Sequence, residues 1–240
     1  MKNKLLLLFT LSVLILVSSC SKDDDEIIPE SELSEYNLDI ISYFKDVALG
    51  FEDGNSSNII RKWKSPMKIY LDGNPSSSIN TKVEQTVNEI NELSTDGFLI
   101  EIVNDANLSN CYIFFGSASD FIEKFPDADG QIGSNYALFQ VWWNNNIINK
   151  ARIFIDTNRP NLTQQKSLVL EEITQSLGLG KDSPRYPNSI FYETPNNGGF
   201  STEYAEIDKE LIRLLYHPKI KAGLTENQVD ELLRSILINE

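Results

Sequence analysis

The sequence predicts an α+β fold, in which a mixed β-sheet with packed helices is followed by a mostly helical C-terminal part. Two observations indicate this. Strand-like and helix-like stretches take turns up to residue 179, and the stretches after residue 201 are helix-like only. Strands that alternate with helices early, with helices alone later, favour a mixed sheet covered by helices.

The first elements follow from the spacing of apolar residues. Apolar residues recur at helical spacing in 33–51 and again in 79–93. The stretch 67–71 alternates and ends at a turn, so it predicts a strand. Two further strands are expected at 98–103 and 111–115.

The second group of elements begins with a short helix at 117–125, which Pro126 stops. Strands at 137–143 and 151–155 are joined through an asparagine-rich stretch. Helices are then expected at 162–179, 202–216 and 225–237. The irregular segment 181–201 between them is long, and such segments usually carry a function or cover a cleft.

The N-terminus predicts a lipoprotein signal peptide at residues 1–20. Lys2 and Lys4 precede an apolar core that is too short to span a membrane. The following Ser-Ser-Cys resembles the lipobox of bacterial lipoproteins, which makes Cys20 the lipid-attachment residue in the outer membrane. An ordinary secretory signal with a chance cysteine is the alternative.

We expect residues 21–32 to form an acidic tether and the domain to occupy 33–240. The domain would have a sheet-and-helix half at 33–180 and a helical half at 181–240. The start of the tether resembles the surface-export signal of Bacteroidetes lipoproteins, although a plain hydrophilic linker is equally compatible. The sequence therefore does not decide whether the protein is exposed at the cell surface.

Composition excludes several kinds of partner and site. The chain has 21 basic and 35 acidic residues, and its net charge of -14 argues against nucleic acid. A single histidine excludes every site that needs two imidazoles, including the usual zinc protease site.

The stretch around residue 172 carries the functional argument. Leu170, Ile173 and Leu177 share one side of the predicted helix and should face the core. Glu171 and Gln175 share another side, with Glu172 beside them. A glycine at 178 can end the helix and turn the chain sharply.

This helix resembles the HExxHxxGxxH motif of metzincin metalloproteases. The resemblance places the three histidine positions at Glu171, Gln175 and Lys181, with Asp182 next to the last. The motif's glutamate and glycine match Glu172 and Gly178, but all three metal-binding histidines are absent.

The chain also resembles a bacterial lipoprotein family without an assigned activity, whose members look like zincins that have lost these histidines. The similar segments are Glu-Glu-Ile-Thr-Gln-Ser-Leu-Gly-Leu, Asp-Ser, Tyr-Pro-Asn-Ser-Ile-Phe and Leu-Leu-Tyr-His-Pro, within 168–237. The N-terminal half agrees only in element order. The resemblance implies a zincin-like fold and no transferable activity.

The residues leave two uses of this helix open. Glu171, Glu172 and Asp182 could bind a hard cation, with a carbonyl from Gln175, or act as acid and base in a hydrolase. Alternatively, Glu171 and Gln175 accept hydrogen bonds from Ser183, Arg185 and Tyr186 and lock the long segment in place. We favour this second, structural role, in which the hydrogen bonds hold the segment, and expect neither a metal nor another cofactor.

Trp142 and Trp143 lie on the strand that forms the cleft edge in the zincin arrangement. Alternation along a strand predicts one ring pointing inward and the other outward. An outward ring could stack on a sugar or pack on a peptide, or a peptide could pair with the strand edge; a core tryptophan is the alternative. The candidate cleft residues are Gln175, Asp182, Ser183, Tyr186, Trp142 and Trp143.

Together these features predict a membrane-anchored lipoprotein with a catalytically degenerate metalloprotease-like domain. It would serve the cell envelope as a binding or structural module, with a peptide, a glycan or an envelope protein as partner. The alternative is a hydrolase that uses Glu171, Glu172 and Asp182, with or without a divalent ion.

Overall fold

The computed structural model describes residues 33–52, 57–194 and 197–239. The signal peptide and tether predicted for residues 1–32, including Cys20, lie outside this part of the chain. None of the helices in the described ranges is both long enough and apolar enough to cross a membrane.

Within the described residues the main sheet has six strands, and it confirms the predicted mixed sheet. Strands β3 (Ile100–Val103), β2 (Met67–Asp72), β4 (Cys111–Gly116) and β6 (Ile147–Asp156) lie side by side and run parallel. The short strand β1 (Lys62–Trp63) pairs in parallel with the start of β6. Strand β5 (Ala137–Asn144) pairs antiparallel with β6 and, among the described strands, with no other, so it forms an edge.

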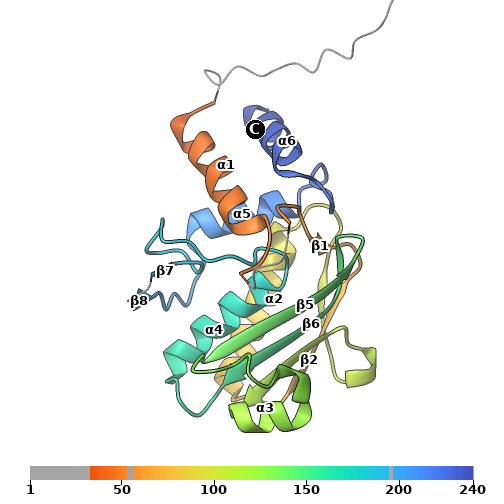
Figure 1. Cartoon of the computed structure of the whole chain (residues 1–240), viewed down its shortest axis with the longest axis vertical. Coiled ribbons are helices and arrows are strands. Elements are labelled where there is room, and N and C mark those ends of the chain that lie inside the picture. The colour runs from red at the N-terminus through yellow and green to blue at the C-terminus, as the bar shows by residue number, and fades with distance from the viewer. Residues whose placement is uncertain (1–32, 53–56, 195–196, 240) are drawn as a thin grey trace, which may run out of the picture.

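In the part of the chain that the structure describes, six α-helices accompany the sheet (Figure 1). They are α1 (Glu35–Ala48), α2 (Ser77–Leu93), α3 (Ala118–Lys124), α4 (Leu162–Gln175), α5 (Glu206–Leu215) and α6 (Glu226–Ile238). Ser34, Ser76, Ser117 and Asn161 each precede a helix and accept a hydrogen bond from a backbone N–H in its first turn. Such caps pair amides that the helix itself leaves free, which explains where these helices begin.

The core lies mainly between the sheet, α2 and α4, and continues among α1, α5 and α6 at the upper end of Figure 1. Leu170, Ile173 and Leu177 are fully buried, as their spacing predicts. Cys111 is buried as well. A smaller cluster beneath α3 includes Phe114, Phe121 and Phe154.

Several elements differ from the prediction. The sequence pattern missed β1, which has only two residues. The asparagine-rich stretch after β5 is mostly strand, because the turn uses only Asn145 and Asn146, both with positive φ. Such a two-residue turn matches the twist of paired antiparallel strands.

The segment 181–201 and the helix after it also differ from the prediction. The segment contains a small hairpin, β7 (Glu193–Thr194) with β8 (Asn197–Gly198). The helix expected at 202–216 begins only at Glu206, since Tyr204 lies buried against Thr174 before the helix starts.

A candidate binding cleft

A cleft of about 1150 Å³ lies between strand β5 and helix α4. All eight consecutive residues 136–143 line it. Successive side chains of a strand point to opposite faces, so a cleft lined by every residue runs along the strand's edge. The opposite wall comes from Leu168, Glu171, Glu172 and Gln175 of α4 and from the segment after it.

The register of β5 shows which of its backbone groups face the cleft. Asp156 donates to the carbonyl of Tyr136 (2.8 Å), so these two residues form a hydrogen-bonded pair. Hydrogen-bonded and non-bonded pairs alternate along antiparallel strands. Leu138 and Gln140 therefore bond β6, whereas Ala137, Phe139 and Val141 direct their N–H and C=O groups to the free edge.

The two tryptophans contradict the predicted alternation. The register of β5 against β6 shifts between Trp142 and Trp143, which indicates a β-bulge. Because a bulge changes the direction of side chains locally, neither ring enters the core. The exposed fractions are 36% for Trp142 and 40% for Trp143, and both line the cleft.

Trp143 belongs to an aromatic wall that reaches across from β5 to the chain after α1. The ring of Phe51 stacks on Trp143 with centroids 5.4 Å apart and also approaches Phe139 at 6.1 Å. Phe51 forms a bridge with Gly180, just beyond α4. The guanidinium of Arg61 lies 4.6 Å from the Trp143 ring centre. These contacts join three distant parts of the chain at one end of the cleft.

The α4 wall carries the residues that sequence analysis singled out. Glu171 is partly exposed, whereas Glu172 and Gln175 are more than 90% buried. Gly178 has a φ of +117°, which turns the chain after the helix as predicted. This turn brings Asp182 back to α4, where its Oδ1 accepts a hydrogen bond of 2.8 Å from the Gln175 Nε2 amide.

The prediction that Ser183, Arg185 and Tyr186 donate hydrogen bonds to two residues of α4 is wrong. Ser183 is buried beside Phe191, Arg185 pairs with Asp39 and Asp46 of α1, and Tyr186 packs edge-on against Tyr43. None of the three lines the cleft. Their side chains hold the segment to α1 instead, and only Gln175 among the predicted acceptors bonds the segment, as a donor to Asp182.

The carboxyl groups of the cleft are strongly perturbed. Burial, together with the charges of Glu193 and Glu52, raises the pKa of Glu171 to about 8. Burial and the carboxyl groups of Glu193, Glu52 and Glu171 raise the pKa of Asp182 to about 10. Burial also raises the pKa of Glu172 well above its ordinary value. Both desolvation and neighbouring like charge disfavour the charged form of a carboxyl group.

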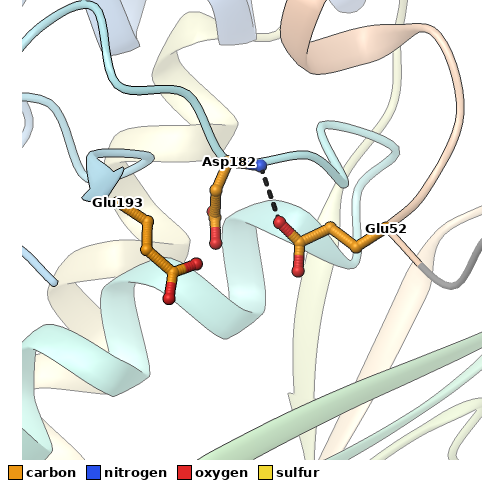
Figure 2. Close-up of side chains that lie close together, drawn as sticks. All are labelled: Glu52, Asp182 and Glu193. Carbon is orange, nitrogen blue, oxygen red and sulfur yellow. Dashed lines mark hydrogen bonds between the residues drawn. The ribbon is translucent and has the colours of Figure 1, made fainter. Parts of the chain in front are cut away.

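Two residues of this group escaped sequence analysis. Glu52 follows α1 and Glu193 begins β7, so they lie 130 and 11 residues from Asp182 along the chain. The Glu52 Oε1 accepts a hydrogen bond of 3.0 Å from the backbone N–H of Asp182 (Figure 2). No local pattern marks either residue, because only the tertiary fold brings them to Asp182.

A buried polar network holds the segment 181–201 in place. Ser189 donates to the Asp208 carboxylate (2.6 Å), and its Oγ lies 2.8 Å from the Tyr43 hydroxyl. Backbone N–H groups of Ile190 and Ala205 also donate to Asp208. Since every member is paired, the network holds the segment rigidly against α1 and α5.

Comparisons with known proteins identify a family. A family model described as "Protein of unknown function (DUF2927)" matches residues 37–235. No curated protein matches the chain.

Three solved structures have a fold with low similarity to that of this chain. Two structures of myroilysin are each 12% identical; in one the TM-score is 0.42, with 77% of this chain and 97% of that chain covered. In the other the TM-score is 0.40, with coverages of 65% and 95%. High choriolytic enzyme 1, a hatching enzyme zinc-protease from Oryzias latipes (Medaka fish), is 12% identical with a TM-score of 0.36, and coverages of 65% and 94%. Scores and identities this low transfer no chemistry to this chain.

Proposed function

The chain belongs to the DUF2927 family, and we propose that it is a lipid-anchored module of the bacterial outer membrane whose cleft binds an extended peptide without cleaving it. The observation that carries this proposal is the free edge of β5. Ala137, Phe139 and Val141 present to the cleft backbone donors and acceptors that no strand of the described residues pairs. An extended peptide can add to such an edge as another strand through main-chain hydrogen bonds.

Apart from the bulge at its end, the edge of β5 lacks two protections that exposed edges usually have. Proteins commonly guard such edges with lysine, proline or a covering element, since an open edge invites unwanted pairing. Residues 137–141 contain neither lysine nor proline. The side chains around this edge include Phe139, Trp143 and Phe51, which offer apolar contacts to alternate side chains of a peptide.

A peptide fits the tryptophans better than a glycan does. Sugar stacking needs an open ring face. Trp143 already has Phe51 and Arg61 against its ring, and Trp142 has Lys150 at 4.8 Å and Arg152 at 5.2 Å from its ring centre. The rings are therefore better placed as side walls for a bound chain.

The carboxyl groups favour binding over hydrolysis. An acid/base pair needs one group that holds its proton and one that has released it. The pKa values of Glu171, Glu172 and Asp182 are all raised, so these three residues do not divide into acid and base. The resemblance to a metzincin helix without its histidines supports the same proposal of a degenerate site.

The proposal that a lipid anchors the protein to the outer membrane is based on the lipobox-like sequence before Cys20. Fully extended, the twelve residues 21–32 of the predicted tether span at most about 43 Å. That length would hold the domain close to the membrane. It would suit a partner that is itself part of the cell envelope.

A backbone-methylation scan tests the proposal. Heptapeptides selected from a displayed random library would be titrated against the full detergent-solubilised chain by fluorescence polarisation. Strand pairing predicts that N-methylation of alternate residues weakens binding by about tenfold or more, while the residues between them tolerate it. Mass spectrometry should recover every peptide intact.

Protein variants provide the matched control. Val141→Pro removes one outward N–H and should weaken binding, whereas Val141→Ala keeps that N–H and should bind nearly as well. Proline is tolerated at an edge position whose N–H faces away from the sheet. Equal affinity of both variants, or a methylation profile without alternation, would contradict strand pairing.

A further inference from the structure

Three carboxyl groups from distant segments converge at the end of the cleft. Glu52 follows α1, Asp182 follows α4, and Glu193 begins β7. One oxygen from each lies within 4.8 Å of the others. Figure 2 shows the three side chains pointing into one space in front of α4.

Glu172 provides an independent indication of a ligand here. Glu172 is only 7% exposed and lines the same cleft. Its Oε2 is fully enclosed and has no hydrogen-bond partner among the described residues. A buried carboxyl oxygen without a partner carries a desolvation cost that a ligand can offset.

No protein cation balances this group within the part of the chain that the structure describes. The ion pairs found there involve none of Glu52, Glu171, Glu172, Asp182 and Glu193. Arg185, close in sequence, is directed to Asp39 and Asp46 instead. Repulsion within the group is therefore relieved only by protons or by an external cation.

We propose that Glu52, Asp182 and Glu193 bind a calcium ion, with Glu171 and Glu172 beside it. Calcium takes oxygen ligands at about 2.3–2.6 Å, so two ligands on opposite sides of the ion are about 4.8 Å apart. The three oxygens lie within that limit. The excess of carboxylates over a single charge favours a divalent ion over a lysine or arginine side chain of a partner.

The site would add a role for the cleft beyond peptide binding. The ion would tie the end of α1, the segment after α4 and the β7–β8 hairpin to one point. Backbone hydrogen bonds already link them, from Glu52 to the carbonyl of Gly180 and from Glu193 to the carbonyl of Ser183, and the ion would add a link between their side chains. Calcium would therefore stiffen one end of the cleft.

Thermal unfolding and calorimetry of the full detergent-solubilised chain test the site without any peptide, so the outcome is independent of the proposed function. After EGTA treatment, about 10 mM CaCl₂ should raise the Tm by about 3–10 °C, since extracellular calcium sites have Kd values of about 0.1–1 mM. The same concentration of MgCl₂ should raise it much less, because magnesium requires shorter and more regular coordination.

Variants distinguish this site from general ion effects. Asp182→Asn and Glu193→Gln should each weaken calcium binding by about tenfold or more. Glu172→Gln should weaken it as well, because it removes a carboxyl group beside the ion. Glu101→Gln, on the far edge strand β3, is the matched control and should leave calcium binding unchanged.

Two results would overturn the site. One is a wild type whose Tm and calorimetric heat are indifferent to calcium. The other is stabilisation that persists undiminished in Asp182→Asn and Glu193→Gln. Equal stabilisation by magnesium would overturn the assignment to calcium.

Discussion

Adding one methyl group at Gly178 should destabilise the protein by about 3.5 kcal/mol. Gly178 has a φ of +117°, a conformation that side chains other than glycine rarely adopt. It costs an alanine about 1–2 kcal/mol. A Cβ built there would also lie 1.9 Å from the carbonyl oxygen of Arg61.

That collision involves backbone that cannot move freely. Gly223 donates to the carbonyl of Ile60, and the Lys62 ammonium is held by Asp96 and by the carbonyl of Leu215. Forcing an extra carbon into such packing typically costs about 1–3 kcal/mol. For a domain of this size the two effects together should lower the Tm by about 7–14 °C.

Gly97→Ala separates strain from collision. Gly97 has a φ of +89°, but a Cβ there meets no atom within 4 Å. This variant should show only the conformational cost of about 1–2 kcal/mol. Urea unfolding of both variants measures the difference, and equal losses of stability would refute the argument that the Arg61 carbonyl encloses Gly178.

Two further predictions concern the buried network and the anchor. Burial raises the pKa of Asp208 to about 6, above its ordinary 3.8. The folded state therefore holds this proton more tightly than the unfolded state does. The resulting contribution to the free energy of unfolding, about 3 kcal/mol, is present below pH 4 and lost as the pH rises through 6. Asp208→Asn should remove that part of the pH dependence of unfolding, and an unchanged slope between pH 4 and 7 would count against it. Cys20→Ser should release the protein from membranes or leave it unprocessed, and palmitate labelling that persists in this variant would rule out the lipobox.

Local patterns were sufficient for most elements of the fold. The spacing of Leu170, Ile173 and Leu177 predicted the buried side of α4, and Gly178 predicted the turn after it, although α4 ends at Gln175 and not at 179. The strand patterns predicted one mixed sheet with Trp142 in it. These features depend on residues within a few positions of one another, so the sequence displays them directly.

Features that depend on distant contacts were missed or wrong. Two-residue strand β1 exists only because β6 lies beside it, and the bulge between Trp142 and Trp143 depends on register. Glu52 and Glu193 meet Asp182 only in the folded chain. The predicted lock failed for the same reason, since Arg185 finds its partners on α1.

Residue-resolved amide hydrogen exchange tests the central claim most directly. The outward amides of Ala137, Phe139 and Val141 should gain about tenfold or more protection when a selected heptapeptide binds the full chain. The inward amides of Leu138 and Gln140 already bond β6 and should change little. Protection that leaves the three outward amides unchanged, or that is confined to α4, would contradict binding along the edge of β5.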